Sequence, residues 1–212
     1  NELNQSINPD LSVDRHSLYS TEFDGTSCID LSSSIDLGTK STISFWIRNQ
    51  VSQDRTILGE NSYGSYFIVK GGYSNFVFKI GTSYMVFTTG STPIIPINGG
   101  WSHLVFVRDS DNVTCYINNS SIGSSSTWTG GSPGGTTTKF DTIGSKSNGS
   151  DFTIGKLSQV SGFNSALTPS QVTDLYNSGT PANVMALPTK PIAYYPLGEQ
   201  ARNTGYLSSG SD

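Results

Sequence analysis

The chain of 212 residues has few residues of the kinds that charged interfaces and catalytic centres use. It contains two cysteines, two histidines and four glutamates, and Lys and Arg together number 12. Its net charge is −4 and its basic residues are scattered singly, which argues against nucleic-acid binding, because a phosphate backbone needs a basic patch. No apolar run approaches the roughly 18 residues of a membrane span.

The two cysteines, Cys28 and Cys115, both fall within expected strands. The sequence has no C-x-x-C pair and no Cys/His spacing of the kind found in metal sites. We expect two small buried thiols, since free cysteine behaves as a small hydrophobic residue. A disulfide, which would require an oxidising compartment, stays open.

Small and polar residues dominate instead: 35 Ser, 22 Thr, 15 Asn and 23 Gly make up nearly half of the chain. This composition argues against a helical bundle or a coiled coil. Aromatic residues reach 11%, which argues against disorder. A chain of this length can bury one sizeable core, so a single folded domain is expected.

Short runs rich in β-branched and aromatic residues recur about every ten residues, which is typical of an antiparallel sandwich or barrel. We expect strands at Tyr19–Phe23, Cys28–Leu31, Thr42–Arg48, Arg55–Gly59, Tyr66–Lys70, Asn75–Ile80, Tyr84–Thr88, Trp101–Arg108, Asn112–Ile117, Lys139–Ile143 and Phe152–Phe163. Alternation along these strands predicts which side chains face inward. The expected core comprises Ile43, Phe45, Ile47, Leu104, Phe106, Val113, Ile117 and Val160.

One helix is expected, over residues 168–178. Thr168 and Gln171 can form a reciprocal capping box, with Pro169 in the first turn. Gly179 suits the left-handed position past the helix end. The segment 124–138 is rich in Gly, Ser and Thr and is expected to be irregular, and 192–197 offers one more strand.

Six motifs follow one another in a fixed order: FDGTSCIDL (23–31), STISFWIR (41–48), GGWSHLVFVRD (99–109), VTCYINN (113–119), DTIGS (141–145) and GKLSQVSGFNSALTPSQVTDLYNSG (155–179). Together they resemble the laminin-G-like jelly rolls of the concanavalin A-like lectin/glucanase superfamily. The resemblance implies an all-β fold, a two-sheet antiparallel jelly-roll sandwich with one short C-terminal helix. We divide the chain into an N-terminal arm (1–18), the β-sandwich (19–179), and a linker with an extra strand (180–212) that can lead to a further module.

The stretch YNSGTPANVMALPTKPIAYYPLGEQ (176–200) resembles segments that join such jelly rolls in large structural proteins of phages and algal viruses. The resemblance implies a non-catalytic surface or adhesion module of a larger assembly, most simply a virion, located on the virion or outside the cell. The expected partners are other copies, other structural proteins of the assembly, and cell-surface glycans.

Catalysis has little support in the sequence. The glucanases of this superfamily resemble one another in a strand with two Glu flanking an Asp, and the nearest counterpart here is the same-face pair Glu22 and Asp24. No Ser/His set accompanies His16 or His103, and we expect His103 to be buried and hydrogen-bonded. A non-enzyme is expected, with glycoside hydrolysis as the weaker alternative.

We expect no cofactor, and a bound calcium ion is the alternative. Asp24 matches a position near a calcium site of the family, but Ser158 stands where the family's partner aspartate would be. A site at Asp24 would make the chain a secreted, calcium-dependent lectin-like module. Asp109 and Asp111 are expected to cap a hairpin turn.

The candidate ligand-binding residues are the loop aromatics Tyr63, Tyr73 and Trp128, since tyrosine and tryptophan rings stack on the apolar faces of sugars. Packing across the base of a loop is the alternative for each of them. Trp46 and Trp101 are expected in the core.

Overall fold

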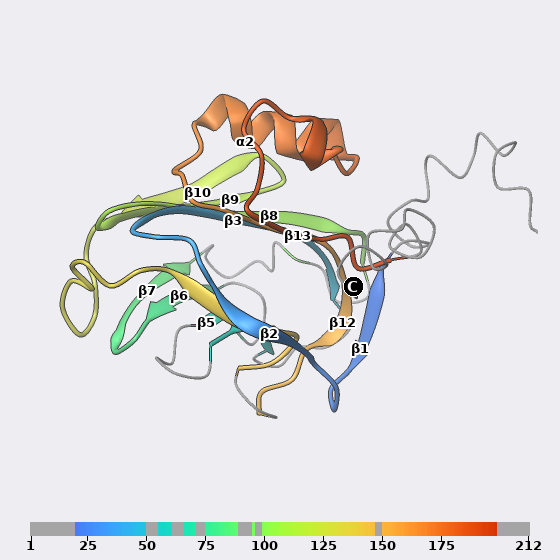
Figure 1. Cartoon of the computed structure of the whole chain (residues 1–212), viewed down its shortest axis with the longest axis horizontal. Helices are drawn as coiled ribbons and strands as arrows, with labels where there is room; N and C mark the ends of the chain where they lie inside the picture. The colour runs from blue at the N-terminus through green and yellow to red at the C-terminus, as the bar shows by residue number, and fades with distance from the viewer. Residues whose placement is uncertain are drawn as a thin grey trace, which may run out of the picture.

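Two antiparallel sheets face each other across an apolar core (Figure 1). The computed structural model describes residues 20–49, 55–60, 66–70, 75–88, 95, 99–146 and 150–198. The seven-stranded sheet has the order β1 (Thr21–Asp24), β12 (Ile154–Phe163), β3 (Lys40–Asn49), β8 (Ser102–Asp109), β9 (Asn112–Ile117) and β10 (Ser120–Ser125), with β13 (Ala193–Tyr195) also paired to β12. The six-stranded sheet has the order β2 (Ile29–Asp36), β11 (Lys139–Ile143), β4 (Arg55–Gly59), β5 (Tyr66–Lys70), β6 (Asn75–Ile80) and β7 (Ser83–Thr88). The predicted two-sheet antiparallel sandwich is confirmed.

Most strand boundaries agree with the sequence pattern, and five strands match it at both ends: β4, β5, β6, β9 and β11. Strand β10 was not expected, because its sequence SSIGSS has a single apolar side chain. It forms nevertheless, since it follows a two-residue turn and pairs along β9. Backbone hydrogen bonding to the edge strand β9 is enough to form this strand, although its side chains show no apolar alternation.

The inter-sheet core contains all eight residues predicted from strand alternation. None of them is more than 3% exposed: Ile43, Phe45, Ile47, Leu104, Phe106, Val113, Ile117 and Val160. Facing rings add to the packing, as where Phe78 and Phe106 meet with centroids 5.9 Å apart. Burial of this apolar surface is the main stabilising term of the sandwich.

The two cysteines are both free thiols but lie in different surroundings. Cys115 is buried in the core, and this burial raises the pKa of its thiol well above the usual value. Cys28 is half-buried, with its sulfur 3.7 Å from an Asp30 carboxylate oxygen. The expectation of a buried thiol is therefore confirmed for Cys115 and wrong for Cys28, which precedes β2 instead of lying within a strand.

Helix α2 (Pro169–Tyr176) begins with the expected capping box. The Gln171 backbone N–H donates to the Thr168 hydroxyl at 3.3 Å, and the Thr168 backbone N–H donates to the Gln171 side chain at 2.8 Å. The left-handed C-cap is Asn177 (φ 45°), not Gly179 as predicted. The 3₁₀ turn η3 (Asn177–Gly179) follows, and Gly179 is left-handed as well, at φ 90°. Asparagine tolerates this conformation better than most residues.

The segment after the helix returns to the sandwich through the 3₁₀ turn η4 (Val184–Ala186) and β13. Strand β13 pairs with β12, and Leu197 joins the inter-sheet core at 9% exposure. Residues 180–198, which the sequence analysis assigned to a linker and an extra strand, thus pack on the sandwich. In the part of the chain that is described, helices are too short or too polar to cross a membrane.

Candidate functional site

The seven-stranded sheet carries a second layer of packing on the side facing away from the inter-sheet core. Helix α2 lies across this side (Figure 1). The ring of His103 stacks on Trp46 with centroids 4.8 Å apart, and Tyr176 of α2 stacks beside both rings at 5.9 and 6.0 Å. A second apolar cluster surrounds them: Val105, Val107, Phe163, Leu167, Val172, Leu175 and Val184. Helix α2 therefore covers the centre of this outer face, and a small pocket remains beside the helix, lined by Leu167, Gln171, Asp174, Leu187, Pro188 and Thr189.

His103 has the structural role that its sequence position suggests. It is 1% exposed, and its Nε2 lies 2.7 Å from the Ser44 hydroxyl. The prediction of a buried, hydrogen-bonded histidine is confirmed. Trp46 is also buried, at 3% exposure, whereas Trp101 is only half-buried.

The outer face of the six-stranded sheet differs, because its edge strand presents side chains to solvent. Buried and exposed residues alternate along β7, and the exposed ones are Tyr84, Val86 and Thr88. Tyr84 is 36% exposed and Val86 is 46% exposed. In the register of β6 and β7, Lys79 stands opposite Tyr84, and Val77 stands opposite Val86. Val77 is only 4% exposed, so the side chains that this face presents are Tyr84, Val86 and the half-buried Lys79.

A loop borders the same face. Thr129, in the 126–138 loop between β10 and β11, exchanges two backbone hydrogen bonds with Tyr84, of 3.0 and 2.9 Å. Gly130 follows with φ 88°, and a Cβ there would lie 2.7 Å from the Thr82 carbonyl oxygen. Glycine is required at this close approach. The exposed face and the 126–138 loop thus form one continuous surface.

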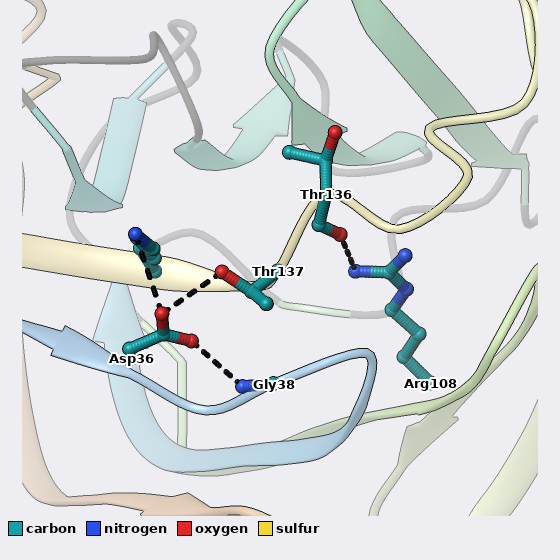
Figure 2. A network of polar contacts seen from close by, with 6 residues as sticks. Asp36, Gly38, Arg108, Thr136 and Thr137 are labelled. Atoms are coloured by element: carbon teal, nitrogen blue, oxygen red, sulfur yellow. Dashed lines mark hydrogen bonds and ion pairs between the residues drawn. The ribbon is translucent and has the colours of Figure 1, made fainter.

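The loop is held from beneath by Arg108, whose side chain is completely buried at the end of β8. Its guanidinium donates to the Ser110 carbonyl at 2.7 Å. It also donates to the Thr136 carbonyl at 2.8 Å (Figure 2). Further bonds reach the Thr138 hydroxyl at 3.2 Å and the Gly134 carbonyl at 3.4 Å. Burial lowers the pKa of Arg108, although arginine stays charged at any physiological pH. A buried cation needs these acceptors, so they fix the loop's conformation.

Asp36 attaches the loop at a second point. Its carboxylate accepts hydrogen bonds from the Gly38 backbone N–H at 2.9 Å and the Thr137 hydroxyl at 3.0 Å, as Figure 2 shows. The Lys139 ammonium lies 3.2 Å from the same carboxylate. Burial alone raises the pKa of Asp36, but the bonds from Gly38, Thr137 and Lys139 outweigh it and lower the pKa below its ordinary value.

Trp128 lies on this loop, with its ring directed into the core. It is 8% exposed, contacts Phe78 edge-on with centroids 6.0 Å apart, and donates from Nε1 to the Asp111 carbonyl at 2.8 Å. A buried ring has no free face for a sugar, so this placement favours packing over the ligand contact suggested by the sequence. The other two expected ligand-binding residues, Tyr63 and Tyr73, lie outside the described residues.

Asp24 is exposed and does not converge with Ser158. Its Oδ1 accepts from both the backbone N–H and the hydroxyl of Thr26 at 2.8 Å, and these bonds lower its pKa. In the strand register Asp24 pairs with Ile154, which places Ser158 four residues away, or about 13 Å along β12. No group of three or more His, Cys, Asp or Glu side chains gathers within the described ranges. The two residues therefore do not form a shared cation site.

The same-face carboxylates expected from the sequence lie at the exposed positions of β1, on either side of the buried Phe23. Glu22 and Asp24 are both exposed on β1, and the Glu22 carboxylate lies 3.8 Å from the Lys156 ammonium. Glu60 is 1% exposed at the end of β4.

Asp109 and Asp111 lie beside the β8–β9 turn. The Asp109 carboxylate lies 2.9 Å from the Lys40 ammonium, and the Asp111 carboxylate accepts from the Ser132 hydroxyl at 2.8 Å. The predicted hairpin at this turn is confirmed.

Two residues of this surface were missed by the sequence analysis. Tyr84 could have been found, because the alternation S-Y-M-V-F-T places its ring opposite the inward Met85 and Phe87. Arg108 carries no such signal, since an arginine at a strand end is ordinarily exposed. Its burial depends on carbonyls more than twenty residues away in sequence.

Solved structures of similar shape come from several sources. A pentraxin of Limulus polyphemus matches with a TM-score of 0.60 and 18% identity, covering 84% of this chain and 91% of that one. Domain 4 of an extracellular arabinanase from Geobacillus stearothermophilus, solved with arabinotriose, matches with a TM-score of 0.55 and 24% identity. The match covers 74% of this chain and 75% of that one. The binding domain of Paraclostridial Mosquitocidal Protein 1 matches with a TM-score of 0.52 and 20% identity, covering 76% of this chain and 48% of that one. At these identities the likeness concerns the fold.

A search of curated protein sequences finds no match. The sequence profile of a laminin G-type family, described as the concanavalin A-like lectin/glucanases superfamily, matches residues 23–173. This range runs from β1 into helix α2 and includes the strands of both sheets apart from β13. The chain therefore belongs to the concanavalin A-like lectin/glucanases superfamily.

Proposed function

We propose that this chain is a non-catalytic recognition module that binds carbohydrate on the outer face of its six-stranded sheet. The observation that carries the proposal is the exposure of Tyr84 and Val86 on this face, beside Lys79 and next to a fixed loop. On the opposite face α2 covers the outward aromatic and aliphatic side chains Trp46, Val105 and Val107, so the exposed stacking ring lies on the six-stranded sheet.

The chemistry of the face suits a sugar. A sugar ring presents an apolar C–H face that can stack on a tyrosine ring, and its hydroxyls bond to neighbouring polar groups. Thr88 on β7, and Thr127 and Thr129 on the bordering loop, supply exposed hydroxyls. The arabinanase domain of similar fold, solved with arabinotriose, lends support by analogy of fold.

The non-catalytic part of the proposal is supported by the positions of the acidic residues and the histidine. Glu22 is exposed beside Lys156, Glu60 is buried, and His103 lies beneath α2. Retaining glycoside hydrolysis needs two carboxyl groups about 5 Å apart on either side of the scissile bond. Measured turnover of a glucan that is lost in Glu22→Gln would overturn this part.

We further propose that the module belongs to a larger structural assembly, a virus particle or another extracellular structure, with other copies or other structural proteins as partners. The support is the resemblance of residues 176–200 to joining segments of phage and algal-virus proteins, together with the hydroxyl-rich composition. An antibody against this chain should label intact purified particles. Its failure to label them, with the chain found only in the soluble fraction, would contradict the proposal.

The binding proposal is tested on a glycan array, run with calcium and with a chelator. Replacing Tyr84 by Ala should weaken binding about fivefold, because stacking is worth about 1 kcal/mol, and Tyr84→Phe should retain most of it. Ile192→Ala is the matched control, since Ile192 is 51% exposed but lies outside this sheet. An equal loss in the control, or no glycan bound at all, would refute the proposed site.

Calcium dependence is a separate arm of the same experiment. If a cation binds only the folded chain, adding calcium raises the melting temperature and a chelator lowers it. We expect neither shift, because Asp24 and Ser158 do not converge. A calcium-dependent shift together with chelator-sensitive glycan binding would favour the calcium-dependent lectin-like alternative.

A further inference from the structure

The exposed face of the six-stranded sheet holds one charged side chain among the described outward residues of β6 and β7. Phe78 and Ile80 point into the inter-sheet core, so Lys79 between them points outward. Its strand neighbours in the register are Tyr84 on β7 and the position of Tyr66 on β5. Lys79 is half-buried, and lysines of intermediate exposure commonly pack the alkyl stem against a sheet while the ammonium group reaches the surface.

The other outward residues of these two strands are neutral at physiological pH: Asn75, Val77, Tyr84, Val86 and Thr88. The acidic residues of the same sheet do not share this position. Glu60 is 1% exposed, so its carboxylate is not presented to a ligand. Asp141 lies on β11, three strands from β6, or about 14 Å across the sheet. Among the described outward residues of β6 and β7, Lys79 is thus the one that carries a charge, on a chain whose net charge is −4.

A lysine beside a stacking ring can favour ligands that carry a carboxylate. The ammonium group has three N–H donors, so a partner within the chain still leaves donors for a ligand. A bond to a carboxylate is charge-assisted and stronger than a bond to a hydroxyl. Tyr84 and Lys79 are paired positions on adjacent strands, whose backbones run about 4.8 Å apart, so one ligand can reach both side chains.

We propose that the carbohydrate recognised on this face is acidic, a glycan with a carboxylate-bearing sugar, and that Lys79 binds the carboxylate while the ring stacks on Tyr84. This inference rests on the proposed function, since it specifies the ligand class of the same site. Neutral glycans are then bound more weakly, through stacking and hydroxyl contacts alone.

The test compares two pairs of probes that differ in charge, by isothermal titration at low and at high salt. The pairs are tetragalacturonate with its methyl ester, and 3′-sialyllactose with lactose. The acidic member of at least one pair should bind about tenfold tighter, and salt should reduce the difference. In Lys79→Gln the preference should disappear, and in Lys79→Arg most of it should remain.

The matched control is Lys156→Gln, which makes the same change in net charge at a partly buried lysine of the seven-stranded sheet. It should keep the preference, and all variants should keep the parent's melting temperature within a few degrees. A parent chain that binds neutral and acidic probes equally, or a preference that survives in Lys79→Gln, overturns the inference but leaves the proposed function standing. Failure to bind any glycan on the array overturns the proposed function itself.

Discussion

The two outer faces of the sandwich are built from the same alternating strand pattern but differ in what lies on them. On the seven-stranded sheet, Trp46, Val105 and Val107 face away from the inter-sheet core and are still at most 8% exposed, because α2 covers them. On the six-stranded sheet, Tyr84 and Val86 occupy equivalent outward positions and are exposed. Alternation therefore identifies the outward residues, whereas tertiary packing, such as that of α2 over Trp46, Val105 and Val107, decides which of them stay exposed.

The difference also separates two uses of aromatic residues. Trp46, His103 and Tyr176 stack with one another and attach the helix to its sheet. Tyr84 leaves part of its ring available, and its backbone is paired to Thr129 of the bordering loop. The rings beneath α2 pack against one another, and the proposed ligand site lies on the face where Tyr84 is exposed.

The largest effect is expected from Trp128→Ala. Removing this buried ring should lower the free energy of unfolding by about 3–5 kcal/mol, measured by denaturant titration. Such a loss assigns Trp128 to the core beneath the loop. An unchanged stability with weakened glycan binding would instead return Trp128 to the ligand-binding set.

A matched pair of substitutions sharpens the contrast between the faces. Leu175→Ala in α2 removes a side chain that is 1% exposed and should cost about 2–5 kcal/mol. Val86→Ala on the open face should change stability by no more than about 0.5 kcal/mol. Equal losses in both variants would mean that the six-stranded sheet is covered in solution, contrary to its exposure here.

Arg108→Met tests the attachment of the bordering loop. It leaves the carbonyls of Ser110 and Thr136 without their buried donor and should cost about 1–3 kcal/mol. Arg108→Lys keeps the charge but loses the planar fork and should restore only part of this. If Arg108→Met is as stable as the parent, the loop is held mainly by Trp128 and Asp36.

The smallest effect concerns Asp36 and depends on pH. Its pKa is lower in the folded chain than in the unfolded one, so its contribution to stability is present above about pH 4 and is lost as the pH falls through the folded pKa. Because the side chain is 47% exposed, solvent screens the pair and the contribution should stay below about 1 kcal/mol. Asp36→Asn should be slightly less stable than the parent at pH 7 and indistinguishable near pH 2. A gap that is unchanged with pH would contradict this assignment.

Sequence patterns predicted the structure wherever the interactions that form an element lie between residues close together in the chain. Period-two alternation predicted all eight inter-sheet core residues, and Thr168, Pro169 and Gln171 predicted the start of the helix. The expectation that Trp101 lies in the core was wrong. The predictions failed where an element depends on backbone hydrogen bonds or backbone conformation, or on residues far away in the sequence. Strand β10 forms by pairing with β9, and Asn177 ends the helix in place of the expected glycine.

The sequence by itself determined that this chain forms an antiparallel sandwich with a short capped helix, because strand periodicity and capping chemistry act within a few residues. Only the tertiary structure decided that α2 closes one outer face, that Trp128 packs on Phe78, and that Arg108 is buried under the 126–138 loop. The strand register likewise separated Asp24 from Ser158 and placed Lys79 beside Tyr84. These outcomes depend on contacts between segments far apart in the chain, whose packing energies no local pattern encodes.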